Sequence, residues 1–190
     1  MSDRDRLRWD ERYASRGAPA PEAIGPPAVF APHAAVFPAG GHALDLACGQ
    51  GATAVWLARR GLSVRALDVS PVAVEQARDL AARAGVAGRC HFEVVDLDDG
   101  LPPGPPADVI VCHRFRDRRL DRAITDRLIP GGLLAISALS AVGAAPGPFR
   151  AEPGELGAAF ADLVVIAAGE GDGEAWLLAR RAPLVDRHHE

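Results

Sequence analysis

The sequence predicts an α/β fold in which a doubly wound, mostly parallel sheet carries helices on both faces. Between residues 42 and 140, short apolar runs alternate with segments of helical pattern, which is the order of successive βαβ units. Continuous apolar runs are typical of strands that are buried on both faces. Two last apolar runs, 163–168 and 175–180, flank a glycine-rich turn and predict an antiparallel hairpin at one edge. The expected sheet is therefore mixed.

The N-terminal forty residues precede this alternation. A helix is expected over residues 5–15, where Trp9 and Tyr13 lie four positions apart and share a face. Six prolines interrupt residues 17–38, and only a short helix around 28–36 is expected there. The aromatic pair predicts either a lid over a bound ligand or a helix packed against the sheet.

The core is expected to contain regular elements in strict alternation. The predicted strands are 42–47, 63–67, 90–95, 108–112 and 133–140, and the predicted helices are 52–60, 71–84, 117–128 and 155–161. Ser70 is the expected N-cap of the second of these helices, because Pro71 follows at the first helical position. The segment Pro130-Gly131-Gly132 is expected to close the third. No helix is expected in the proline-rich loop 98–106.

Size and composition indicate one globular domain. The chain has 190 residues, of which 48% are hydrophobic and 24% charged. We divide it into an N-terminal helix with a proline-rich lid segment (1–40), a core (41–181) and a tail (182–190). The net charge is −4, with 21 basic and 25 acidic residues. This balance argues against a nucleic-acid partner, because phosphate neutralisation by basic residues supplies most of the affinity of such proteins.

The cysteines and the hydropathy predict a cytoplasmic protein without a metal site. Cys48, Cys90 and Cys112 are odd in number and far apart, so they indicate reduced thiols rather than disulfides or metal ligands. The charged N-terminus is unlike a signal peptide, and no apolar run is long enough to cross a bilayer. The adjacent His188 and His189 do not by themselves make a metal site.

The run Asp45-Leu46-Ala47-Cys48-Gly49-Gln50-Gly51 joins the first strand to the first helix and predicts a ligand site. Ligands of doubly wound sheets bind beyond the carboxyl ends of the strands. The two glycines permit a sharp turn and a close approach of the ligand, while the helix start presents free N–H groups. Gly49, Gly51 and Ala54 also satisfy the glycine pattern of dinucleotide-binding domains. Asp45 favours a different ligand, because its carboxylate would repel a pyrophosphate and attract the ammonium group of S-adenosylmethionine.

Two further acids lie at the ends of predicted strands. Asp68 can accept hydrogen bonds from both hydroxyls of a ribose, or it can serve the dipole of the helix that begins beside it. Asp96 can accept a hydrogen bond from an adenine amino group while Leu97 packs on the ring, or it can shape the turn at 96–100.

Together these residues resemble the class I S-adenosylmethionine-dependent methyltransferases over about residues 7 to 181. The likeness rests on the Asp45–Gly51 run, Asp68, Asp96 and the segment Leu128-Ile129-Pro130-Gly131-Gly132. The segments 9–13, 53–61 and 150–156 are similar to those of small bacterial tellurite-resistance-type members. Two features depart from the family pattern. Ala47 stands where many members have glycine, and the proline-rich loop after Asp96 stands where members often have a helix.

The resemblance implies a Rossmann-like, seven-stranded mixed sheet with the last strand antiparallel. It implies S-adenosylmethionine as cofactor and S-adenosylhomocysteine as product. Asp45, Gly49 and Gly51 would hold the methionine moiety, Asp68 the ribose, and Asp96 with Leu97 the adenine. With neighbouring positions included, the expected cofactor-binding residues are Trp9, Tyr13, Asp45, Ala47, Cys48, Gly49, Gln50, Gly51, Asp68, Val69, Ser70, Asp96, Leu97 and Cys112.

Methyl transfer from a sulfonium is an in-line displacement that needs alignment and a water-poor pocket. His113 and Arg114 follow the fourth strand and are the candidate catalytic residues. His113 is either a general base or a partly exposed loop or packing histidine without a chemical role. Arg114, Arg116 and Arg150 can hold an anionic acceptor. Because the sequence shows no carboxylate that would orient His113, we expect a small-molecule acceptor that is already nucleophilic, such as a thiol or chalcogen anion.

Two other functions fit the same residues. A nicotinamide-dependent oxidoreductase would use the same glycine loop, although Asp45 and the absence of an obvious second substrate domain argue against it. A catalytically inactive module that binds S-adenosylmethionine would keep the loop and lose the turnover. Titration with both cofactors distinguishes the first alternative, and turnover with a panel of acceptors distinguishes the second.

Overall fold

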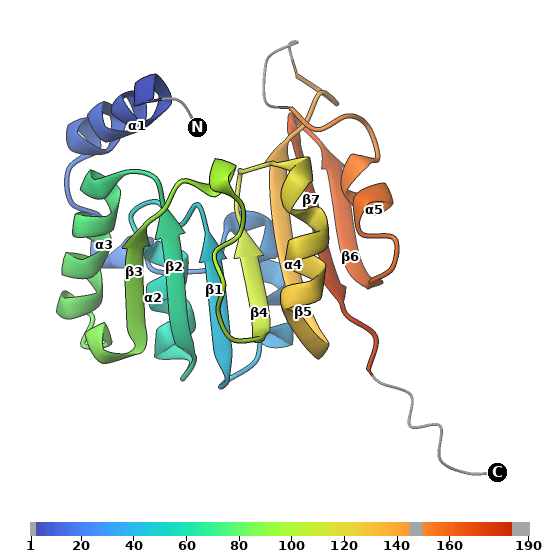
Figure 1. Cartoon of the computed structure of the whole chain (residues 1–190), viewed down its shortest axis with the longest axis horizontal. Coiled ribbons are helices and arrows are strands. Elements are labelled where there is room, and N and C mark those ends of the chain that lie inside the picture. Colours follow the sequence, from blue (N-terminus) through green and yellow to red (C-terminus); the bar gives the residue numbers. More distant parts are fainter. Residues whose placement is uncertain (1–2, 145–149, 184–190) are drawn as a thin grey trace.

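The computed structural model describes residues 3–144 and 150–183, and a seven-stranded sheet runs through them in the order β3-β2-β1-β4-β5-β7-β6 (Figure 1). Its strands are β1 (His42–Leu46), β2 (Ser63–Asp68), β3 (Cys90–Val94), β4 (Ala107–Cys112), β5 (Leu128–Leu139), β6 (Val164–Gly171) and β7 (Glu174–Arg180). Strands β1 to β5 pair in parallel, whereas β7 runs antiparallel to both β5 and β6. The predicted mixed sheet with an antiparallel last strand is confirmed.

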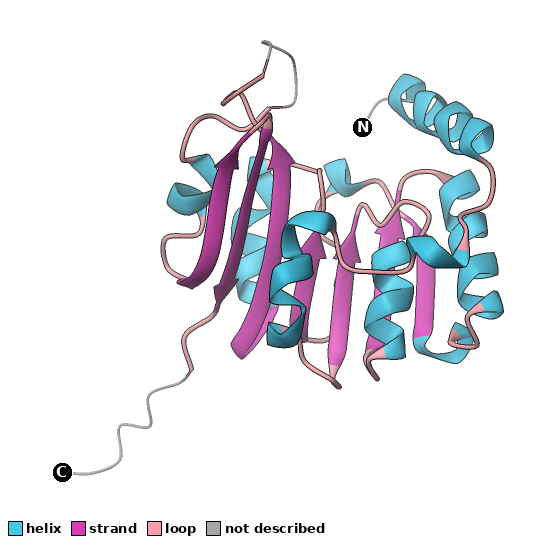
Figure 2. Ribbon diagram, turned by 180° about the vertical axis from the view of Figure 1, so that it is seen from behind, coloured by secondary structure: helices cyan, strands magenta, loops and turns pink. Residues whose placement is uncertain are grey.

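Helices cover both faces of this sheet, as Figures 1 and 2 show from opposite sides. The α-helices are α1 (Asp3–Arg16), α2 (Ala52–Arg59), α3 (Pro71–Arg83), α4 (Asp121–Arg127) and α5 (Glu155–Ala159). The 3-10 helices are η1 (Pro21–Ala23), η2 (Ala28–Val36), η3 (Ala87–Arg89), η4 (Leu97–Asp99) and η5 (Arg118–Leu120). Residues of η2, α2 and α3 form the hydrophobic core on one face, and residues of η4, α4 and α5 form the core on the other.

The strands divide their side chains between these two cores by simple alternation. In β5, Leu133 and Ala135 belong to the first core, while Leu134 and Ile136 belong to the second. All four are almost completely buried. Burial of a leucine or isoleucine side chain contributes about 1.5–3 kcal/mol, so a central strand with two apolar faces is held firmly in place.

The C-terminal half of the sheet differs from the expectation at β5. The strand begins at Leu128, five positions earlier than predicted, and the glycines of the expected helix-closing turn lie within it. The backbone explains the difference, because Gly131 N–H donates to the carbonyl of Arg181 at 2.8 Å and Arg181 N–H donates to the carbonyl of Gly132 at 2.9 Å. These bonds join the segment to the chain that leaves β7. The preceding predicted helix is correspondingly split into η5 and a shorter α4.

Two shorter segments refine the prediction. Residues 28–36 form a helix as expected, but of the 3-10 type, with Pro32 inside it. A proline within an α-helix would remove a backbone hydrogen bond and clash with the preceding turn. In the proline-rich loop after β3, the structure adds only the single turn η4, whose first N–H groups are capped by Asp96.

Helix α1 lies across the carboxyl ends of the strands, close to α3 (Figure 1). Three side-chain hydrogen bonds fasten this N-terminal segment to the core. The Ser70 hydroxyl donates to the carboxylate of Asp10, Gln76 Nε2 donates to the carbonyl of Tyr13 at 3.2 Å, and Gln50 Nε2 donates to the carbonyl of Gly17 at 2.7 Å. The segment therefore sits above the loops where a ligand of this fold would bind.

Within the described ranges, every helix is too short or too polar to cross a membrane. Residues 184–190, with His188 and His189, lie outside the described part of the chain.

Candidate functional site

The glycine loop leaves β1 and turns sharply into α2. Its backbone conformation is left-handed at Ala47 (φ +54°), Gly49 (φ +53°) and Gly51 (φ +80°). Cys48 N–H donates to the carbonyl of Leu67 at 2.9 Å, so the loop is fastened to the neighbouring strand β2. The left-handed value at Ala47 is unfavourable for a residue with a Cβ, and a glycine would adopt it without that cost.

The two glycines serve different purposes, which the sequence pattern does not distinguish. A Cβ on Gly49 would lie 2.9 Å from the hydroxyl of Tyr13, which lines the cavity. A Cβ on Gly51 would lie 2.7 Å from Cβ of Ala77 and 3.0 Å from the ring of Phe92, inside the core between α2, α3 and β3. Gly51 thus permits close packing of α2 against α3 and β3, whereas Gly49 lies beside the cavity, and the predicted contact of both glycines with the ligand stays a prediction.

Asp68 ends β2 and is largely buried. Its Oδ2 accepts the N–H of Gly49 at 2.8 Å, and its Oδ1 accepts the N–H of Ser70 at 2.9 Å. Burial raises the pKa of Asp68, and these backbone donors oppose the shift. The carboxylate therefore orders the glycine loop and faces the cavity with its remaining lone pairs.

Asp45 lies on β1 beneath the loop and is 2% exposed. It accepts a hydrogen bond from the backbone of Ala54 at the start of α2, but its Oδ2 has no partner within the part of the chain that the structure describes. Burial, with a smaller contribution from the charge of Asp68, raises the pKa of Asp45 to about 8. A buried carboxylate oxygen without a partner is costly, and a cationic ligand group would stabilise it.

A cavity of about 370 Å³ lies between the glycine loop and α1, within the usual size range of small-molecule sites. It gathers eleven of the predicted site residues, which come from five separate segments of the chain: Trp9, Tyr13, Ala47, Cys48, Gly49, Gln50, Asp68, Val69, Leu97, His113 and Arg114. Sequence reasoning missed eight others: Arg12, Arg16, Pro19, Ala23, Ala52, Thr53, Val95 and Phe115. The helical spacing from Trp9 to Arg12 and Arg16 was a usable signal for two of these.

The remaining predicted residues lie behind the cavity wall. Ser70 caps α3, because its Oγ accepts the N–H of Ala73 at 3.1 Å. Asp96 Oδ1 accepts the N–H of Asp98 at 2.9 Å at the start of η4. Cys112 is buried, and its thiol donates to the carbonyl of Phe115 at 3.4 Å. These side chains shape the loops that bear the lining residues.

Trp9 and Tyr13 stack on each other with ring centroids 5.7 Å apart and form part of the cavity roof. The guanidinium of Arg12 lies 5.1 Å from the centre of the Trp9 ring, on the same helix. Burial, followed by the nearby charge of Asp68, raises the pKa of the Tyr13 hydroxyl, so this group is a neutral donor near neutral pH. The aromatic pair thus lines the cavity, and its role as a lid over a ligand stays a prediction.

His113 directly follows β4 and is half-buried at the cavity wall. Its Nδ1 lies 2.8 Å from the hydroxyl of Ser137 on β5 and 4.0 Å from Oε1 of Glu174 on β7. The neighbouring Arg114 donates its N–H to the Ser137 hydroxyl at 3.1 Å and pairs with Glu174 at 3.0 Å. The sequence shows no orienting partner for His113, but the fold supplies two, so the argument for an already ionised acceptor loses its basis.

Two arginines that the sequence suggested as residues holding an anionic methyl acceptor form bonds to other parts of the protein instead. The side chain of Arg116 is 6% exposed and pairs with Asp121 at 2.9 Å and with Glu155 at 2.7 Å. Arg150 donates to the carbonyl of Ser140 at 2.6 Å. Neither residue lines the cavity, and both hold loops in place. Arg114 alone of the three faces it.

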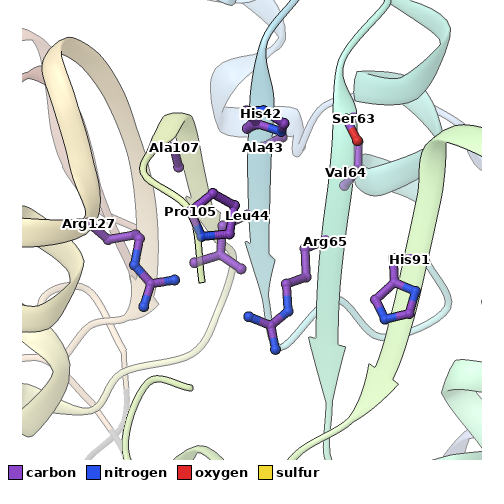
Figure 3. Close-up of a pocket in the computed structure, with 10 residues that line it drawn as sticks. All are labelled: His42, Ala43, Leu44, Ser63, Val64, Arg65, His91, Pro105, Ala107 and Arg127. Atoms are coloured by element: carbon purple, nitrogen blue, oxygen red, sulfur yellow. The ribbon is translucent and has the colours of Figure 1, made fainter. Parts of the chain in front are cut away.

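A second cavity, of about 250 Å³, lies at the amino ends of the strands, on the side of the sheet opposite to the glycine loop (Figure 3). The guanidinium groups of Arg65 and Arg127 point into it from two sides. Arg65 forms a two-pronged ion pair with Glu93 and donates to the carbonyl of Pro103 at 2.7 Å, and Arg127 donates to the carbonyl of Pro102 at 2.8 Å. These bonds brace the proline-rich loop, and the cavity is remote from the glycine loop.

The order of strands, the glycine loop after β1 and the acid at the end of β2 define a Rossmann-like nucleotide-binding domain. A covered cavity lies beyond the carboxyl ends of the strands, where this class of fold binds its ligands.

Comparison with known proteins narrows this class to a family. Residues 43–132 match the family described as "Methyltransferase domain". A ribosomal RNA small subunit methyltransferase C from Chromohalobacter salexigens is 33% identical over 141 residues, which are 68% of this chain and 38% of that protein. A ubiquinone biosynthesis O-methyltransferase from Xanthomonas axonopodis pv. citri is 32% identical over 114 residues, 57% of this chain and 47% of that protein. The matched stretches thus span less than half of these relatives.

Solved structures share the fold. TehB from Haemophilus influenzae superposes with a TM-score of 0.66 at 19% identity, covering 74% of this chain and 57% of that chain. An S-adenosylmethionine-dependent methyltransferase from Mesorhizobium loti superposes with a TM-score of 0.66 at 21% identity, and the match covers 81% of this chain and 98% of that chain. Residues 43–132 therefore carry a methyltransferase domain, and the chain shares its fold with S-adenosylmethionine-dependent methyltransferases.

Proposed function

We propose that this chain transfers a methyl group from S-adenosylmethionine to a small-molecule acceptor. The observation that carries the proposal is Oδ2 of Asp45, which has no hydrogen-bond partner among the described residues and is buried beneath the glycine loop that borders the cavity. An ammonium group is the ligand chemistry that stabilises such an oxygen, and the methionyl end of S-adenosylmethionine carries one. A pyrophosphate would offer Asp45 no such stabilisation, which argues against a nicotinamide cofactor.

The described residues fit the rest of this cofactor. Gly49 keeps the loop backbone free of a side chain beside the cavity, and Asp68 faces the cavity with a carboxylate suited to ribose hydroxyls. Leu97 and Val69 supply apolar surface for an adenine ring, and Asp96 stands beside Leu97. When bound, S-adenosylmethionine supplies an electrophilic methyl group on a positively charged sulfur.

The chain's own contribution is alignment and exclusion of water. Helix α1 covers the cavity through Trp9 and Tyr13, and its hydrogen bonds to α3 hold it there. An in-line displacement gains several kcal/mol when the two reactants are held in register in a dry pocket. The covered cavity, together with the net charge of −4, supports a small acceptor rather than an RNA.

RNA methylation is the second candidate, because ribosomal RNA methyltransferases are among the relatives. Calorimetry with S-adenosylhomocysteine, with NAD as the control ligand, tests the cofactor. Release of S-adenosylhomocysteine with thiols, catechols, carboxylates and ribosomal RNA then tests the acceptor. We expect turnover with a small molecule and little dependence on salt. Turnover confined to RNA and suppressed by salt would contradict the small-molecule assignment, and binding without any turnover would indicate an inactive module.

A further inference from the structure

The cluster around His113 contains one buried and one partly buried side chain that the sequence did not connect with it. Ser137 is completely buried on β5, and Glu174 lies on the adjacent antiparallel strand β7. Both side chains project to the same face of the sheet, since Ser137 stands opposite Trp176 and Glu174 stands two residues before it. His113 reaches this pair from the end of β4 while its ring remains at the cavity wall.

The charge that lies near Nδ1 favours one tautomer of the His113 ring. The Ser137 hydroxyl accepts the N–H of Arg114 at 3.1 Å and lies 2.8 Å from Nδ1, a hydrogen-bond distance that fits either tautomer. Glu174 Oε1 is buried, has no hydrogen-bond partner among residues 3–144 and 150–183, and lies 4.0 Å from Nδ1. Its negative charge favours a proton on Nδ1. In that tautomer Nε2 carries a free lone pair.

Several charged groups surround this ring and set its basicity. Burial lowers the pKa of His113, Glu174 opposes the shift, and Arg114 adds to it. Across the cavity, α1 presents Arg12, Arg16 and Tyr13, and β2 presents Asp68. The ring is therefore neutral near pH 7, which is the form that accepts a proton.

We infer that His113 is the general base of the methyl transfer, that Ser137 and Glu174 are its positioning residues, and that the acceptor is a protonated hydroxyl of phenolic type. The inference rests on the proposed function and names its substrate class. A phenol has a pKa near 10 and needs such a base at neutral pH, whereas a thiol, with a pKa of about 8.5, ionises unaided to a useful extent.

The step balances without any further reactant. The acceptor oxygen forms a bond to the methyl carbon as the bond between that carbon and the sulfur breaks, and the electron pair of the broken bond stays on the sulfur of S-adenosylhomocysteine. The hydroxyl proton passes to Nε2 of His113 and then to water. The carboxylate of Glu174 stabilises the imidazolium formed in between, as a carboxylate behind a catalytic histidine does in other enzymes.

The first experiment reads the His113 ring directly by nitrogen-15 NMR of the full chain, without any acceptor. We expect the Nδ1–H tautomer in the wild type, and a further lowering of the His113 pKa in Glu174→Gln because the favourable charge is lost. Glu170→Gln is the matched control on the same hairpin, since Glu170 bonds Ser140 and Gly154 instead. An Nε2–H tautomer, or the same His113 pKa in wild type and Glu174→Gln, would overturn the inference.

The second experiment uses catechols and dithiothreitol as probe acceptors. General-base catalysis contributes about 100- to 10,000-fold, so His113→Ala should lose at least about 100-fold with catechols and much less with dithiothreitol. Ser137→Ala should lower catechol turnover and shift the acidic limb of the pH–rate profile. The control Ser140→Ala changes a buried serine just beyond the end of β5 and should leave that limb in place. Undiminished catechol turnover in His113→Ala would overturn the inference. If the wild-type protein does not bind S-adenosylhomocysteine in calorimetry, the proposed function itself is overturned.

Discussion

Alanine at Gly51 should destabilise the domain strongly, although the residue belongs to the glycine loop of a ligand site. The backbone there has φ +80°, and an added Cβ would lie 2.7 Å from Cβ of Ala77 and 3.0 Å from the ring of Phe92. A left-handed backbone costs about 1–2 kcal/mol for a residue with a Cβ. Overpacking a rigid core adds about 1–3 kcal/mol, so the free energy of unfolding should fall by about 2–5 kcal/mol.

Gly85 provides the control that isolates the backbone contribution. Its φ is +72°, and a Cβ there would meet no described atom within 4 Å. Gly85→Ala should therefore lose only the backbone cost, about 1–2 kcal/mol. Urea unfolding should separate the two variants by about 1–3 kcal/mol, which corresponds to about 2–12 °C in Tm for a chain of this size. Equal losses in Gly51→Ala and Gly85→Ala would refute the packing role.

Gly49→Ala should show the converse behaviour. Its φ is +53°, and the added Cβ would approach the Tyr13 hydroxyl, which is the far end of a side chain that can move. Its stability should match that of Gly85→Ala, while its affinity for S-adenosylhomocysteine falls because the cavity floor is altered. Calorimetry on the folded variant tests this, and wild-type affinity would show that Gly49 does not border the ligand.

Three further perturbations test the lid and the two buried acids. Asp68→Ala should weaken S-adenosylhomocysteine binding by about 2–4 kcal/mol, as two charge-assisted hydrogen bonds are lost, and unchanged affinity in calorimetry would refute the ribose assignment. Asp45 has its pKa raised to about 8, against about 4 in the unfolded chain, so it destabilises the ligand-free fold increasingly as pH rises from about 4 to about 8. Urea unfolding should show a smaller decline over that range in Asp45→Asn, and identical profiles would contradict the shift. Gln76→Ala removes the bonds to Tyr13 and Gln50, so S-adenosylhomocysteine should leave about 5- to 30-fold faster in stopped-flow, whereas the exposed Glu75→Ala should not change the rate.

Local signals in the sequence determined the order of elements and most of their limits. The Ser70 cap with Pro71 marked the start of α3, and the glycine-rich turn marked the hairpin of β6 and β7. Asp45 on β1 and the glycines after that strand indicated the cofactor, because the chemistry of a loop at a strand's carboxyl end follows from its residue types. These features depend on neighbours within a few positions, which the sequence shows directly.

Contacts between distant residues were decided by the tertiary structure alone. The early start of β5 depends on backbone hydrogen bonds that join Gly131 and Gly132 with Arg181, and the packing role of Gly51 depends on α3 and β3. The partners of His113 come from two later strands whose register places Ser137 and Glu174 on one face. The pattern of the sequence fixes which face of a strand is buried. Only the pairing of strands and the docking of α1 determine which polar groups come into contact on that face, and these contacts form the site.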